Sequence, residues 1–179
     1  MKYLFPVTLI LLATQAFAEL KLPHIFGSQM VLQRDEPARI WGWADVEKEI
    51  VITFAGQRKS IVSGKDGKWE ISLDPMPANA TGQALEIVSE DHSIILDDVL
   101  LGDVWICGGQ SNMEWRLRSS RDADIEIPSA RYPAIRFIRI EPEGLPEPQD
   151  DFPSENGAGI WNQCSPETIG DCSGVAYFF

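Results

Sequence analysis

The sequence predicts a β-sandwich followed by the first part of a three-layer α/β domain with a parallel sheet. Between residues 20 and 98, apolar and polar residues alternate in short runs separated by turn residues, which is typical of half-buried strands. From Val99 to Cys107 the apolar run is nearly continuous, which indicates a strand covered on both faces, as in parallel sheets. We therefore expect a domain boundary at Asp97-Asp98, with domains at 19–98 and 99–179.

The first of these regions contains several segments with the character of strands. They cover residues 39–43, 49–54, 69–73, 85–88 and 93–96. The segment Lys65-Asp-Gly-Lys68 predicts a tight hairpin turn, because Asp-Gly tolerates the positive φ angles of a type I′ turn. A second turn is expected at Glu90-Asp91. Short strands at this spacing favour a small β-sandwich, in which Trp41, Trp43 and Trp69 are expected to be core residues.

The segment Val104–Leu117 predicts a strand, a sharp bend and a helix. Val104–Cys107 would be the buried strand, and Gly108 and Gly109 would let the backbone turn. Ser111 would then lie between the strand and a helix over 113–117. Backbone N–H groups and the helix dipole at such a bend stabilise negative charge. This geometry suits an acyl-transfer nucleophile or a phosphate site, and the phosphate alternative is weakened because no Gly-Lys-Ser/Thr follows the glycines.

The region after Ser111 is expected to hold fewer elements than a complete α/β domain. They are a helical turn at 125–130, a strand at 136–140, a long surface loop over 141–158, and a helix with Ser165 as N-cap and Pro166 at its first position that continues to the end. The apolar tail Val175–Phe179 needs a packing partner. We therefore expect this sequence to be the amino-terminal portion of a longer protein.

Composition and the amino-terminal segment limit the function classes. The 179-residue chain has a formal net charge of −12, which disfavours binding to nucleic acid and to anionic membranes. Met1–Ala18 has a basic start, an apolar run and the small-x-small site Ala16-Phe-Ala18, which predicts a secretory signal peptide cleaved before Glu19. The protein is then exported to the periplasm or the medium and has no membrane segment after cleavage.

The three cysteines suggest no metal site. The spacing of cysteines and histidines does not match a zinc motif, and no cofactor is expected. Cys107 is expected in the buried strand as a small core residue. Cys164 and Cys172 would be able to form a disulfide if the segment between them bends, but not if it is one continuous helix.

Two sequence blocks resemble a known family. Gly109-Gln-Ser-Asn-Met113, preceded by Leu101-Gly-Asp-Val-Trp-Ile106, is similar to the first signature block of sialate O-acetylesterases, which are carbohydrate esterases of the SGNH-hydrolase type. Met30-Val-Leu-Gln-Arg34 and Ile40-Trp-Gly-Trp-Ala44 resemble the amino-terminal segment of that family. The resemblance runs from about Leu22 to Phe179 and implies an SGNH-type α/β domain after residue 98.

This resemblance implies that Ser111 is the nucleophile and that its backbone N–H is one oxyanion donor. Gly109, Gln110 and Asn112 would shape the loop or donate to the substrate, an acetylated sugar. A serine hydrolase also needs a base. The family supplies it from a late Asp-x-x-His block, whereas the two histidines of this chain, His24 and His92, both precede Ser111 and are expected on loops or the surface. These 179 residues are therefore expected to be inactive or nearly so.

Three further side chains are candidates for substrate contact. Trp115 and Trp161 would be able to stack on a sugar ring, although tryptophans at such positions are more often core residues. Arg116 would be able to bind an acidic group such as a sialate carboxylate. The alternative function is a non-catalytic carbohydrate-binding or scaffolding module formed by residues 19–98, with the Ser111 segment as a remnant.

Overall fold

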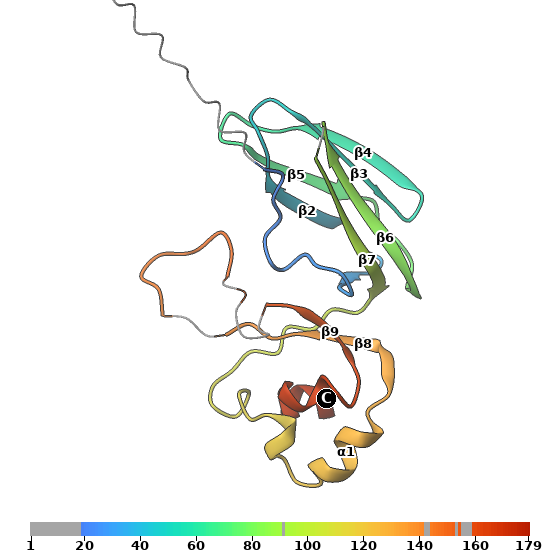
Figure 1. Cartoon of the computed structure of the whole chain (residues 1–179), viewed down its shortest axis with the longest axis vertical. Coiled ribbons are helices and arrows are strands. Elements are labelled where there is room, and N and C mark those ends of the chain that lie inside the picture. The colour runs from blue at the N-terminus through green and yellow to red at the C-terminus, as the bar shows by residue number, and fades with distance from the viewer. Residues whose placement is uncertain (1–18, 91, 142–143, 153, 155–158) are drawn as a thin grey trace, which may run out of the picture.

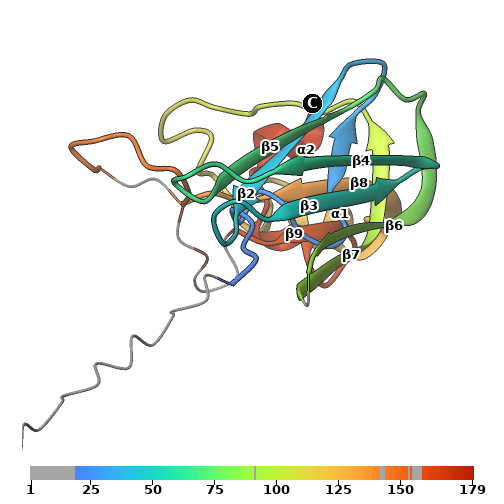
Figure 2. The same cartoon turned by 90° about the horizontal axis from the view of Figure 1, so that it is seen from above.

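The computed structural model describes residues 19–90, 92–141, 144–152, 154 and 159–179, so the predicted signal peptide lies outside the described residues. The chain folds mostly as sheet, with a few short helices near its carboxyl end (Figure 1). In Figure 1 the strands β2 to β7 lie together in the upper part and the elements from α1 onward lie in the lower part, and seen from above the two groups overlap (Figure 2).

The first part contains two sheets that share one hydrophobic core. A five-stranded mixed sheet has the order β1 (Val31–Gln33), β7 (His92–Gly102), β6 (Asn79–Ser89), β3 (Glu49–Phe54), β4 (Gln57–Val62), and only β1 and β7 pair in parallel among its neighbours. A two-stranded antiparallel sheet joins β2 (Ala38–Trp43) to β5 (Lys68–Leu73). Alternate residues of these strands, such as Ile40, Ile52 and Leu73, are fully buried in the core. The predicted period-2 pattern is confirmed for β2, β3 and β5.

The turn predicted at Lys65-Asp-Gly-Lys68 forms, but the hairpin does not. The Gly67 N–H donates to the Gly64 carbonyl at 2.9 Å. However, this turn connects β4 to β5, which belong to different sheets, because β4 pairs instead with β3. β4 is not predicted from the sequence, because its first four residues are polar and its position at a sheet edge leaves Ile61 and Val62 exposed, so that it has no apolar alternation.

The acidic pair predicted as a domain boundary lies inside a continuous strand. β7 runs through Asp97 and Asp98 to Gly102. Two residues of β7 lie between the partners Leu96 and Val99, opposite one residue of β6, so the acidic pair forms a β-bulge, with Asp98 at φ 57°. The division into domains at residue 98 stays a prediction.

The prediction of a buried strand at Val104–Cys107 is wrong. Val99–Leu101 are buried where β7 contacts β1 and β6, but no strand is present at 104–107. Trp105 is 68% exposed and Ile106 is 97% exposed, and Cys107 is also exposed. The apolar residues continue beyond the end of β7 at Gly102, but among the described residues no strand lies beside 104–107 to pair with them. Hydrophobicity along the chain does not show where a strand loses its pairing partners.

The second part packs around a smaller cluster. Its elements are the 3-10 helix η1 (Leu117–Ser119), α1 (Ala123–Ser129), β8 (Tyr132–Ile138), β9 (Trp161–Cys164), the 3-10 helix η2 (Ile169–Asp171) and α2 (Gly174–Phe178). β8 and β9 form an antiparallel pair. The cluster contains the buried side chains of Leu117, Ala130, Cys164, Ile169 and Cys172, and both cysteines are free thiols.

The helix predicted from Ser165 to the carboxyl end is wrong. Residues 165–168 form a turn in which the Thr168 hydroxyl donates to the Gln163 carbonyl. The helix α2 begins only at Gly174, with the hydroxyl of Ser173 as its N-cap acceptor at 3.4 Å from the Ala176 nitrogen. Ser and Pro at 165–166 predict a helix start, but local hydrogen bonds to Thr168 compete with the helix.

A partly buried ion pair joins the first part of the chain, which holds β1 to β7, to the second part, which begins at η1. The Arg136 guanidinium, on β8, donates to Asp98 of β7 at 2.8 Å, and its side chain is 3% exposed. Gln163 of β9 donates to the same carboxylate oxygen at 2.8 Å. The Trp161 indole N–H donates to the Ile25 carbonyl at 2.8 Å. These contacts attach β8 and β9 directly to the five-stranded sheet.

Candidate functional site

Ser111 lies in an exposed loop, residues 103–116, that is attached at both ends. At the first end, the Val104 N–H donates to the side-chain oxygen of Gln33 at 2.9 Å, and Asp103 pairs with Arg34 at 2.9 Å. At the second end, the Trp115 carbonyl accepts from the Gly174 N–H at 2.8 Å. The loop therefore connects β7 to the second hydrophobic cluster.

The backbone around Ser111 forms consecutive turns rather than the predicted helix. The N–H groups of Met113, Glu114 and Trp115 each donate to the carbonyl three residues earlier, at 2.8, 3.2 and 3.4 Å. The next helical element is the three-residue 3-10 helix η1, which begins at Leu117, so no α-helix begins at Ser111 to supply an aligned helix dipole. The turns are tight at Gly109, where a Cβ atom would lie 2.6 Å from Cγ of Met113, so this position requires glycine or movement of Met113.

The turns leave a set of backbone donors unused. Within the described residues, the N–H groups of Gly109, Gln110, Ser111 and Asn112 make no hydrogen bond, and these residues are exposed. The Ser111 hydroxyl is likewise free of any described partner. A nucleophile beside several unpaired N–H groups is the arrangement that binds a developing oxyanion.

Neither histidine is bonded to Ser111. Nδ1 of His24 lies 2.8 Å from the Asp151 carboxylate, and the His24 backbone N–H donates to the same carboxylate at 2.9 Å. His92 is exposed and is the first residue of β7 rather than part of a turn. Within the described part of the chain, no side chain is hydrogen-bonded to Ser111 in the position of a general base.

The structure separates the three side chains predicted for substrate contact. Trp115 is close to Ser111 in sequence and 57% exposed, and its indole N–H donates to the Ser119 carbonyl at 3.0 Å. Arg116 pairs with Asp171 at 3.0 Å, and Arg118 pairs with the same carboxylate at 2.5 Å, so one carboxylate is shared by two guanidinium groups. Trp161 is half-buried, packs against the first core and is bonded to the Ile25 carbonyl. Its contacts are those of a packing residue, and sugar stacking by Trp161 stays a prediction.

The cysteines differ in environment. Burial raises the pKa of the Cys172 thiol to about 11, with the neighbouring Cys164 adding to the effect. Burial also raises the pKa of Cys164. Both thiols are therefore protonated at neutral pH and poor nucleophiles or metal ligands. Over the described ranges, no group of three His, Cys, Asp or Glu side chains is arranged to hold a metal ion, and no helix there is long and apolar enough to cross a membrane.

The prediction that Trp41 and Trp43 are core residues is wrong. Trp69 is buried as expected, whereas Trp41 is 37% exposed and Trp43 is half-buried. Both side chains project from the outer face of β2, because Ile40 and Gly42 occupy its core face. The alternation within Arg39–Trp43 was the signal for this orientation, since Trp41 and Trp43 fall on the face opposite Ile40.

Comparisons with known proteins give a consistent family of relatives. The chain is 28% identical over 159 residues to the sialate O-acetylesterase of Pongo abelii, 27% over 159 residues to that of Homo sapiens, and 31% over 137 residues to that of Mus musculus. These matches cover 80%, 80% and 69% of this chain, but only 29%, 29% and 25% of the relatives. No family model matches the chain.

A solved structure shows the same similarity. The crystal structure of a carbohydrate acetylesterase from Xanthomonas citri superposes with a TM-score of 0.84 at 30% sequence identity, over 89% of this chain and 36% of that one. The chain thus spans about a third of the length of the proteins it matches, or less. In sequence and in structure, the chain resembles part of the sialate O-acetylesterases and of a carbohydrate acetylesterase.

Proposed function

We propose that this chain is the part of an exported carbohydrate O-acetylesterase that carries the nucleophile, Ser111. The observation that carries the proposal is the structural match to a carbohydrate acetylesterase at a TM-score of 0.84. The similarity to sialate O-acetylesterases points to the same class of substrate, an acetylated sugar. No metal ion or organic cofactor is needed for this chemistry.

The reaction we propose is acyl transfer through a covalent intermediate. The hydroxyl oxygen of Ser111 attacks the carbonyl carbon of the acetyl ester and gives up its proton. The bond to the sugar oxygen breaks, and the sugar leaves as an alcohol after taking up a proton. Water then attacks the acetyl-serine, releasing acetate and restoring Ser111. The unused backbone donors at Gly109 and Ser111, with the exposed amides of Gln110 and Asn112, support an oxyanion site.

We further propose that the chain supplies the nucleophile without its base. No histidine follows Ser111 in this sequence, and His24 is paired with Asp151. General-base catalysis contributes roughly 10²–10⁴-fold to rates of this kind. The chain alone should therefore hydrolyse acetylated sugars at the background rate, and the base would come from an Asp-x-x-His block like that of the family it resembles.

The fold that accompanies this function is a β-sandwich followed by the start of an SGNH-type α/β domain. Two observations support the proposal. The five-stranded and two-stranded sheets share one core, and a separate cluster forms around Leu117 and Ile169. The second part holds the short pair β8 and β9, which this proposal assigns to the beginning of the α/β domain.

A half-reaction on the purified chain tests the role of Ser111. The chain is incubated with an activated acetyl ester, with and without imidazole as an external base, and the acetylated peptides are identified by mass spectrometry. We expect imidazole-dependent acetylation at Ser111 and none at Ser60, an exposed serine on β4 that serves as the internal control. The variants Ser111→Ala and Ser60→Ala should respectively lose and keep the modification.

The outcomes separate the two parts of the proposal. Equal acetylation of Ser111 and Ser60 would refute a special role for the loop. Release of acetate from O-acetylated xylan or O-acetylated N-acetylneuraminic acid without imidazole, abolished by Ser111→Ala, would confirm the nucleophile but refute the missing base.

A further inference from the structure

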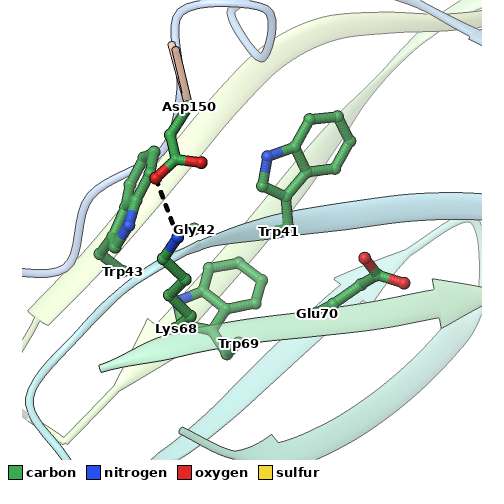
Figure 3. Close-up of a pocket in the computed structure, with 7 residues that line it drawn as sticks. All are labelled: Trp41, Gly42, Trp43, Lys68, Trp69, Glu70 and Asp150. Carbon is green, nitrogen blue, oxygen red and sulfur yellow. Dashed lines mark hydrogen bonds and ion pairs between the residues drawn. The ribbon is translucent and has the colours of Figure 1, made fainter. Parts of the chain in front are cut away.

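The outer face of the two-stranded sheet forms a cavity lined by aromatic side chains. Trp41 and Trp43 project from β2 toward the same side, because residues two apart in a strand share a face (Figure 3). The cavity has a volume of about 320 Å³. It is closed at one side by Asp150, which comes from the segment 144–152 rather than from the sheet. None of its residues belongs to the Ser111 loop.

The strand register places a charged side chain opposite each aromatic ring. Trp41 pairs with Glu70, and Trp43 pairs with Lys68, in the antiparallel ladder between β2 and β5. All four are on the outer face of the sheet. Cross-strand neighbours of this kind lie only about 5 Å apart at Cβ. A ligand resting on either ring is therefore within reach of a hydrogen-bonding group.

Each of the two rings, Trp41 and Trp43, contacts a side chain from outside the two-stranded sheet. The ring of Phe26 packs edge-on against Trp41, with centroids 4.6 Å apart and an interplanar angle of 76°. The Lys21 ammonium lies 5.7 Å from the centroid of the Trp43 ring. Trp41 nevertheless stays 37% exposed. A held and partly exposed aromatic ring loses little entropy when a ligand stacks on it.

The polar groups of the cavity include both donors and acceptors. Lys68 and Asp150 are paired at 2.8 Å, and the hydrogen bond from Lys68 to Asp150 raises the pKa of that lysine, so the ammonium stays charged. Glu70 is exposed and adds a second carboxylate. Trp69, which also lines the cavity, is 4% exposed, and its indole N–H has no acceptor among the described residues.

We propose that this cavity binds one neutral sugar ring. A pyranose presents a flat C–H face that stacks on an aromatic ring, and its hydroxyls both donate and accept hydrogen bonds. The volume is at the lower end of the range of about 300–1,000 Å³ for ligand sites, which fits a single ring. Both carboxylates of the cavity already have cationic partners, Lys68 for Asp150 and Arg39 for Glu70, so binding does not require a charged ligand. The inference goes beyond the esterase proposal, because it does not use Ser111.

Titration of the ¹⁵N-labelled chain with simple glycosides tests this site. The probes are methyl β-D-glucopyranoside, methyl β-D-xylopyranoside and the methyl glycoside of N-acetylneuraminic acid, and the indole N–H signals of the tryptophans report binding. We expect the neutral glycosides to shift the Trp41 and Trp43 signals with a Kd of about 1–10 mM. The acidic glycoside should not bind more tightly than the neutral ones, because the ammonium of Lys68 is already paired with Asp150.

Three variants and two controls make the result specific. Trp41→Ala should weaken binding about tenfold or more, and Trp41→Phe should recover part of it. Glu70→Ala, which leaves the rings intact, should weaken binding through lost hydrogen bonds. Trp105→Ala removes a more exposed tryptophan from outside the cavity, and Ser111→Ala removes the proposed nucleophile; neither should change binding. The two proposals are thereby tested separately.

The opposite results overturn the inference. It fails if no neutral glycoside shifts the Trp41 signal, or if Trp41→Ala binds as the unchanged chain does while its spectrum remains that of the folded protein. It also fails if Ser111→Ala alone abolishes binding. Tighter binding of the acidic glycoside than of the neutral ones would refute the neutral ligand.

Discussion

The ion pair between Asp98 and Arg136 should be the most sensitive electrostatic contact of the fold. We consider Asp98→Asn, because asparagine keeps the size of the side chain and tolerates the positive φ angle of 57° at this position. The substitution leaves the Arg136 guanidinium in place with its side chain 3% exposed. The other acceptors for this guanidinium are two neutral carbonyls, Pro133 at 2.7 Å and Gln29 at 3.3 Å, and neither carries a charge.

The expected cost follows from the burial of the arginine. Removing one partner of a fully buried ion pair costs about 3–5 kcal/mol, because an uncompensated charge stays behind. Asp98 itself is 35% exposed, so water partly replaces the lost carboxylate. A charge-assisted hydrogen bond is worth about 1.5–3 kcal/mol. We therefore expect Asp98→Asn to lower the free energy of unfolding by about 2 kcal/mol at pH 7.

This difference should depend on pH in one direction only. The hydrogen bond from Arg136 lowers the pKa of Asp98 in the folded chain; the bond from Gln163 adds to this, and burial opposes it. A carboxyl group with a lowered pKa contributes stability above its unfolded pKa of about 3.9, and this is lost as the pH falls through the folded pKa. The gap between the unchanged chain and Asp98→Asn should stay constant from about pH 7 to 5 and shrink below about pH 4.

Urea unfolding followed by tryptophan fluorescence measures both effects. Asp74→Asn is the matched control, because Asp74 pairs with Lys59 at 2.6 Å but is 72% exposed, and it should change the free energy of unfolding by less than about 0.5 kcal/mol. If Asp98→Asn lowers the free energy of unfolding by no more than this control does, the ion pair between Asp98 and Arg136 does not stabilise the fold. A cost that stays the same at low pH would show that the carboxylate charge is not its cause.

Three further predictions follow from the structure. The Leu117 side chain has no exposed surface in the second cluster. Leu117→Ala should therefore lower the free energy of unfolding, measured with heat or urea, by about 2–5 kcal/mol. A cost below about 1 kcal/mol would show that this cluster is loosely packed. In the folded chain, the exposed Cys107 should react with iodoacetamide at pH 8 well before Cys172, because the Cys172 thiolate forms only as the pH approaches its pKa of about 11. Peptide mass spectrometry measures the two rates, and equal rates would contradict the burial of Cys172. Finally, amino-terminal sequencing of the protein made in an exporting bacterial host should begin at Glu19, and recovery of the uncleaved chain would count against a signal peptide.

Local patterns predicted much of the first part of the fold. The alternation in 49–54 and 69–73 predicted strands with the observed buried faces, because one side of each strand packs on a single core. The candidate loop was also found from sequence, because Gly109 and Ser111 belong to a motif that is read residue by residue. The conformation of this loop was not predicted correctly. Exposed chain replaces the strand expected before Ser111, and turns replace the helix expected after it.

The amino-acid sequence by itself determined the resemblance to carbohydrate esterases, the position of Ser111 and the strands that pack on the first core. These depend on residue type and on spacing along the chain. Only the tertiary structure decided that β4 pairs with β3, that Asp98 meets Arg136 and that Asp150 pairs with Lys68. Each of these pairs residues through strand register or through packing between segments far apart in sequence. Such contacts form where the free energy of the whole fold is lowest, which no local pattern records.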